Sequence, residues 1–130
     1  MSAAVQFYAN EHGNMSNQPK NDPDLYLWVL GWLANRYRGD QTLAEVGDAL
    51  KQYDGKGLTG SGYRKMEKGE SANLRAWWWL FEHYGKDVVS ILSVSRVLVR
   101  AIQEEELNRG RELTDSERDR VVSELYAMFD

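Results

Sequence analysis

Three predicted helices lie in the stretch 42–84, TLAEVGDALKQYDGKGLTGSGYRKMEKGESANLRAWWWLFEHY. A capping box opens the first helix, because the Thr42 side chain can accept from the N–H three residues on while Glu45 reaches back. This helix is expected to end near Tyr53. A glycine-rich turn follows and separates it from the next helix.

The second predicted helix is short. Thr59 caps it, and it runs to Lys68, after which Gly69 stops it. The third is expected from about Asn73 to Tyr84. A capped helix, a turn, a short helix and another amphipathic helix therefore follow one another.

The third helix carries three consecutive tryptophans on different sides. At helical spacing, one face and the expected buried side is formed by Leu74, Trp77, Trp78, Phe81 and Tyr84. Trp79 points the other way, together with Arg75 and His83. Trp79 is either an exposed aromatic side chain without a role or the anchor of an interface, and both alternatives stay open.

Helices are also expected on both sides of this stretch. Pro23 suits a first helical position, and apolar residues recur at helical spacing from about Asp24 to Arg38. A long apolar helix is predicted over 88–108, and a second capping box at Thr114 opens a last helix. The chain is thus expected to be all-α, with five to six helices and no strand.

Three segments are predicted from these elements. Residues 1–21 are polar and form an expected flexible arm, residues 22–87 a helical domain, and residues 88–130 a C-terminal helical hairpin. The net charge of -4 comes mainly from the last segment, which carries 6 basic and 9 acidic residues. The segment from Lys56 to Lys65 is nevertheless basic, because it contains no acidic residue.

Composition argues against several functional classes. The chain of 130 residues has no cysteine, and His12 and His83 share no helical face, so no metal site, cofactor or catalytic constellation is predicted and the protein is not expected to be an enzyme. The sequence contains neither an apolar run long enough to span a membrane nor a secretory signal. We expect a cytoplasmic protein that makes no membrane contact.

The order and spacing of these elements resemble the helix-turn-helix domain of the lambda-repressor-like (XRE-type) family. The resemblance covers about half the chain, from the first helix to about Val89, and rests on four segments: Thr42–Leu50, Gly57–Thr59, Met66–Glu70 and Ser71–Leu74. The family's core positions fall on Val46, Tyr63, Met66, Leu74, Trp77 and Trp78.

The resemblance implies a set of DNA contacts. The family's base-reading positions fall on Gly60, Ser61, Arg64 and Lys65. Phosphates would be held by backbone N–H groups at two helix starts and by Thr42, Lys56, Thr59 and Lys68. The resemblance thus implies that residues 22–87 form a helix-turn-helix DNA-binding domain. The implied function is a sequence-specific regulator of transcription, acting as a repressor on a double-stranded DNA operator, without a cofactor.

Three features depart from the family pattern. The turn between the second and third family helices is longer by the segment Lys51–Lys56, Gly60 and Gly62 occupy the first turn of the recognition helix, and Leu43 replaces the usual Gln. The glycines either allow close backbone approach to phosphate or mark a surface turned toward a protein partner. The alternative function is therefore a protein-binding inhibitor, antitoxin or adaptor built on the same fold.

A homodimer is expected because one such module buries too little DNA surface for tight specific binding. The broad apolar surface of the last two helices is its predicted interface, formed by Ile91, Val94, Leu98, Ile102, Val122, Leu125 and Phe129. An intramolecular hairpin that closes a monomeric core is the alternative.

Overall fold

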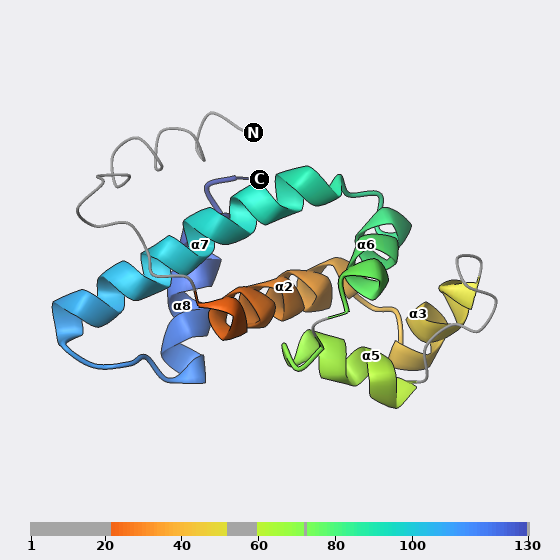
Figure 1. Ribbon diagram of the computed structural model, residues 1–130, viewed down its shortest axis with the longest axis horizontal. Coiled ribbons are helices and arrows are strands. Elements are labelled where there is room, and N and C mark those ends of the chain that lie inside the picture. The colour runs from red at the N-terminus through yellow and green to blue at the C-terminus, as the bar shows by residue number, and fades with distance from the viewer. Residues whose placement is uncertain (1–21, 52–59, 72, 130) are drawn as a thin grey trace. The chain divides into compact units, whose positions relative to one another are not determined.

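The computed structural model describes residues 22–51, 60–71 and 73–129, and all regular structure in these ranges is helical (Figure 1). The helices are α2 (Pro23–Arg38), α3 (Leu43–Ala49), α5 (Gly60–Glu67), α6 (Leu74–His83), α7 (Val88–Arg109) and α8 (Asp115–Tyr126). The all-α prediction is confirmed over the described ranges. The predicted arm 1–21 lies outside them.

The predicted helix starts are confirmed where the structure describes them. The Thr42 side chain accepts from the N–H of Glu45 at 3.1 Å, and Asn73 accepts from the N–H of Ala76 at 3.2 Å. Helix α3 ends at Ala49, four residues before the predicted end near Tyr53, which itself lies outside the described residues. Local capping thus decides the starts of these helices.

Two compact units make up the chain, and each is described by itself. The N-terminal unit is Pro23–Ile91, and the C-terminal unit contains the described residues 92–129. The division falls within α7, four residues after the predicted boundary at 87. Within the described residues, no helix is long and apolar enough to cross a membrane.

In the N-terminal unit, α5 packs against both α2 and α3. Buried apolar side chains of this unit are Leu25, Val29, Leu30, Leu33, Ala34, Val46, Leu50, Tyr63, Met66, Ala76, Trp77, Leu80, Phe81, Val88 and Ile91. Four of the six core positions implied by the resemblance are among them, namely Val46, Tyr63, Met66 and Trp77.

The other two implied core positions are wrong, because Leu74 is 64% exposed and Trp78 is 42% exposed. The Trp77 ring stacks on Phe81 with 5.8 Å between centroids, and its Nε1 donates to the Ser71 carbonyl at 2.8 Å. The buried face of α6 is therefore turned toward Ala76 and Leu80 and leaves Leu74 and Trp78 outside it. Because the apolar residues of α6 extend well beyond one side, its neighbours rather than its own pattern choose the buried side.

The C-terminal unit contains the rest of α7 and all of α8. Its buried apolar side chains are Val97, Leu98, Val99, Ala101, Ile102, Leu113, Val122, Leu125 and Tyr126. Five of the seven predicted dimerisation residues are buried within a single chain: Ile91, Leu98, Ile102, Val122 and Leu125. Val94 is half-buried. Since a buried side chain has no surface to offer a second copy, this arrangement favours the intramolecular alternative for these residues.

Helix α8 ends before Phe129, the last of the predicted dimerisation residues. Helix α8 ends at Tyr126, and Met128 and Phe129 lie in the turn that follows. Met128 is exposed, whereas the half-buried Phe129 ring meets Tyr126 edge-on at 6.1 Å between centroids. Phe129 is thus a predicted dimerisation residue that contacts its own chain.

A cluster of Arg109, Arg111 and Glu117 connects the end of α7 to the start of α8. The predicted capping box is confirmed: Thr114 accepts from the N–H of Glu117, and the Glu117 carboxylate accepts from the N–H of Thr114. The same carboxylate accepts from Arg111 at 2.8 Å and from Arg109. Hydrogen bonds from Arg111 hold the pKa of Glu117 well below its usual range.

We expect Glu117→Gln to lower the melting temperature at neutral pH, because the amide replaces a carboxylate that accepts charge-assisted hydrogen bonds. A carboxyl group with a lowered folded-state pKa stabilises the protein above its ordinary pKa, and this contribution is lost as the pH falls through the folded-state value. The difference between wild type and variant should therefore shrink on acidification. Thermal melts from neutral to acidic pH measure it, and a difference independent of pH contradicts the assignment.

Candidate nucleic-acid interface

Helix α5 is amphipathic, and its two sides carry different chemistry. Tyr63 and Met66 are buried, whereas Arg64, Lys65 and Lys68 are exposed. At helical spacing the three basic residues share the side opposite Tyr63 and Met66. We call the side formed by Arg64, Lys65 and Lys68 the basic face of α5.

Two glycines allow the end of α5 to approach the backbone of α2 closely. A Cβ built on Gly31 would lie 2.8 Å from the Glu67 carbonyl carbon and 2.9 Å from the Met66 carbonyl oxygen. One built on Gly69 would lie 2.9 Å from the backbone of Trp28, and Gly69 itself has a φ of 76°. Only glycine fits both contacts, so α5 is held against α2 at backbone distance.

A cluster of three side chains fixes the same contact from the polar side. Arg38 Nε donates to Glu67 at 2.6 Å, and Asn35 donates to the same carboxylate at 2.9 Å. The Glu67 side chain is 9% exposed, and its hydrogen bond raises the pKa of Arg38. Sequence reasoning missed this cluster, because nothing in the pattern of α2 or α5 alone pairs residues that are 29 positions apart.

The same arginine reaches the connection between α2 and α3. Arg38 Nη1 donates to the carbonyl of Gln41 at 2.6 Å, one residue before Thr42 caps α3. Since α3 also packs on α5, one side chain links α2, α5 and the start of α3. These contacts hold α5, and with it the basic face, in a fixed position against α2 and α3.

On the side of α5 opposite the basic face, the hydroxyls of the buried Tyr63 and the half-buried Tyr84 hydrogen-bond to each other. Burial raises the pKa of Tyr84 to about 12, and burial together with the Tyr84 contact raises the pKa of Tyr63 as well. Both phenols are neutral at physiological pH. The interior side of α5 thus adds no phenolate charge to offset the basic face.

The predicted DNA contacts divide into two groups. Exposed side chains are found at Thr42, Arg64, Lys65 and Lys68. Gly60 and Ser61 lie in the first turn of α5, with only their backbone described, and Lys56 and Thr59 lie outside the described residues. The structure therefore brings Arg64, Lys65 and Lys68 to one side of α5.

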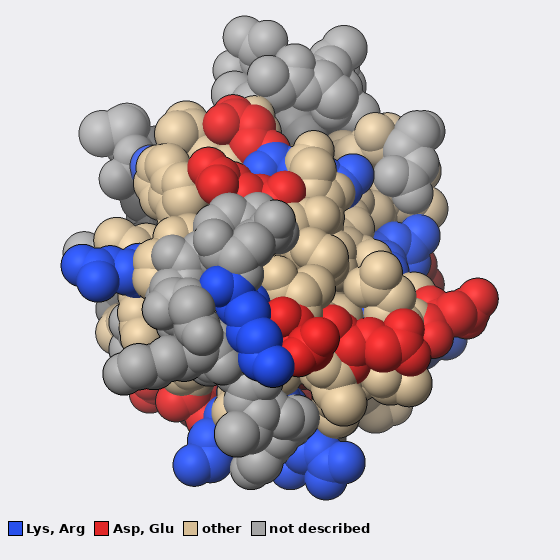
Figure 2. All heavy atoms as spheres, turned by 90° about the vertical axis from the view of Figure 1, so that its right-hand side faces the viewer, with Lys and Arg blue, Asp and Glu red and all other residues tan. Residues whose placement is uncertain are grey.

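The surrounding charge is mixed. Figure 2 shows the side of the molecule on which α3, α5 and α6 lie in Figure 1, and its basic side chains form separate groups between acidic ones. The nearest acid on α5, Glu67, is bonded to Arg38 and does not neutralise the exposed basic residues. On α5, the positive charge that could attract a polyanion is therefore limited to the basic face.

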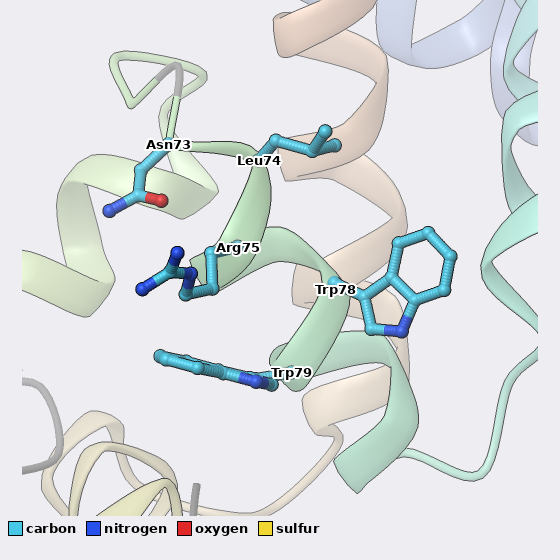
Figure 3. A pocket seen from close by; sticks show the side chains of 5 residues that line it. All are labelled: Asn73, Leu74, Arg75, Trp78 and Trp79. Atoms are coloured by element: carbon cyan, nitrogen blue, oxygen red, sulfur yellow. The ribbon is translucent and has the colours of Figure 1, made fainter. Parts of the chain in front are cut away.

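A second surface lies on the outer side of α6 (Figure 3). An open pocket of about 720 Å³ is lined by Asn73, Leu74, Arg75, Trp78 and Trp79. The Arg75 guanidinium lies over the Trp79 ring, 5.9 Å from its centroid. The sequence separated Trp79 from the buried face of α6 but placed Trp78 wrongly within it.

The described residues contain no group of three or more His, Asp or Glu side chains that could hold a metal ion. Comparisons with protein-family models, with curated proteins and with solved structures found no match for this chain.

Proposed function

We propose that this chain is a sequence-specific, double-stranded DNA-binding regulator of transcription, acting as a repressor and as a homodimer without enzymatic activity. The observation that carries the proposal is the basic face of α5, a short helix whose opposite side is buried against α2 and α3. An exposed helix of this kind fits the major groove of B-form DNA.

Each exposed side chain has a suitable role in this proposal. Arg64 and Lys65 can donate to the O6 and N7 acceptors of guanine, and Lys68 and Thr42 can donate to phosphate oxygens. The close backbone contact at Gly31 and the Arg38 to Glu67 ion pair restrict how far α5 can shift. A rigid frame supports specificity because donors and base edges must align closely.

The proposal is tested by selecting bound duplexes from a random-sequence library and titrating the enriched site with salt. Enrichment of a defined site is expected. With about four phosphate contacts, the affinity for that site should fall about 100-fold between about 50 and 200 mM salt. Failure to enrich any duplex, or an affinity that does not respond to salt, contradicts the proposal.

The second candidate function is a protein-binding inhibitor, antitoxin or adaptor. The exposed Leu74 and Trp78 on α6 favour it, because large apolar side chains gathered on a surface are typical of protein contacts. Under this alternative, duplex selection fails while the α6 surface still mediates association.

A further inference from the structure

The outer side of α6 carries two charges and two aromatic side chains. Arg75 and Glu82 are seven residues apart, so they lie about 10 Å apart along the helix and on nearly the same side. Trp78 and Trp79 lie between them and diverge to the two sides in Figure 3. We call Arg75, Trp78, Trp79 and Glu82 the outer face of α6.

This face is complementary to itself. A two-fold axis that passes between Trp78 and Trp79 would pair α6 with an antiparallel copy. Arg75 then lies opposite Glu82 of the partner subunit, twice. Because such an axis keeps each lateral side of the interface on the same side, Trp78 lies beside Trp78 of the partner subunit and Trp79 beside Trp79 of the partner subunit. A parallel arrangement would instead place like charges together.

The positions of Arg75 and Glu82 are also unfavourable with respect to the macrodipole of α6. A cation near a helix start and an anion near a helix end oppose the macrodipole. Arg75 is the second residue of α6 and Glu82 is the second from its end. With respect to the macrodipole this placement is unfavourable, and an opposite charge outside the helix would offset it.

Both charged groups keep bonding capacity for a second copy. The indole of Trp78 donates to Oε1 of Glu82 at 3.1 Å, and a carboxylate has further acceptor sites. The Arg75 guanidinium lies over the Trp79 ring, 5.9 Å from its centroid, and a guanidinium carries five N–H donors that this contact does not occupy as hydrogen bonds. The intrachain contacts therefore orient these groups without exhausting them.

We propose that the outer face of α6 binds a second copy of this chain in an antiparallel, two-fold arrangement. This contact would form the homodimer of the proposed function, and its role therefore rests on that proposal. The residues of the face are defined without reference to DNA. The dimer contact is thereby moved from α7 and α8, where five of the seven predicted residues are buried, to the outer face of α6. A single pair of ten-residue helices is a small interface, so the dimer is expected to be weak and reversible.

Charge exchange on the full chain tests the contact. Sedimentation equilibrium without DNA, from about 5 to 500 µM, should show a monomer and dimer in exchange, a range suited to weak association. Arg75→Glu and Glu82→Arg should each weaken the dimer about 10-fold, because each places like charges opposite one another. The double variant should recover to within about 3-fold of wild type, since the exchanged pairs attract again.

The variants are designed not to disturb folding. Both substitutions improve the match of α6 to its macrodipole, so a loss of association does not reflect a loss of helix. Arg96→Glu makes the same change of charge on exposed α7 and should leave the dimer unchanged. Circular dichroism confirms that all variants are equally helical.

The remaining outcomes overturn the inference. A wild-type chain that is monomeric at all concentrations excludes the dimer, and a dimer insensitive to both single variants lies elsewhere. A double variant that stays as weak as the single variants excludes the antiparallel pairing. None of these results depends on duplex binding, so a failure here is distinct from a failure of the DNA-binding proposal.

Discussion

An Arg64→Ala, Lys65→Ala double variant is expected to bind its selected duplex about 100-fold more weakly, or worse, than the wild-type chain. Each base contact of this type contributes about 1 to 3 kcal/mol, so two together contribute about 2 to 6 kcal/mol, and a total of about 3 kcal/mol within that range corresponds to about 100-fold. Both side chains are exposed on the basic face of α5, and neither supports the core. The melting temperature should therefore stay close to that of wild type. Fluorescence anisotropy with the selected duplex, beside a thermal melt, measures both.

The matched control is an Arg96→Ala, Arg120→Ala double variant. It removes the same two positive charges from exposed positions on α7 and α8, so the net charge of the whole chain changes equally. If a general loss of positive charge weakened binding, both double variants would behave alike. We expect only the α5 variant to lose affinity, and equal loss in the two would refute the assignment of α5 as the recognition helix.

Local signals in the sequence predicted the helices well. The caps at Thr42, Asn73 and Thr114 mark the starts of α3, α6 and α8 because a cap depends only on residues within one turn. The end of α3 at Ala49 was missed, since amphipathic spacing continues past the last helical hydrogen bond. Boundaries of this kind depend on the packing of the following turn.

Which side of a helix is buried was harder to predict. On α6, spacing alone placed Trp78 inside, but the buried side is formed by Ala76, Trp77, Leu80 and Phe81. On α7, the same limitation led to a predicted dimer interface at Leu98, a residue that is fully buried within one chain. Helices that are apolar nearly all round leave this choice to their neighbours.

The candidate site could likewise be predicted only where local spacing determines it. The exposed basic residues Arg64 and Lys65 follow from helical spacing within α5. The groups that brace this helix do not, because Arg38 and Glu67 are distant in sequence and meet only when α2 and α5 pack. Gly31 likewise carries no local signal, since an isolated glycine within a helix only lowers its stability.

Gly31→Ala is expected to destabilise the chain by about 2 to 3 kcal/mol, although alanine is the better helix former. In an open helix this substitution would stabilise by about 1 kcal/mol. At this position the added Cβ meets backbone atoms of Met66 and Glu67 at 2.9 and 2.8 Å, and backbone cannot rotate aside as a flexible side chain would. The end of α5 must therefore move away from α2, and the bonds from Arg38 to Glu67 lengthen with it.

Variants at two other glycines serve as controls, because they distinguish this steric clash from the general effect of replacing glycine by alanine. Gly39 and Gly69 both have positive φ, but a Cβ on Gly39 meets nothing within 4 Å, whereas one on Gly69 meets Trp28 at 2.9 Å. Gly39→Ala should cost only the left-handed strain of about 1 kcal/mol, and Gly69→Ala should cost clearly more. Urea denaturation of the three variants gives the comparison. If Gly31→Ala were as stable as wild type, α5 would not be held against α2 at backbone distance, and the rigid presentation of Arg64 and Lys65 would have no structural basis.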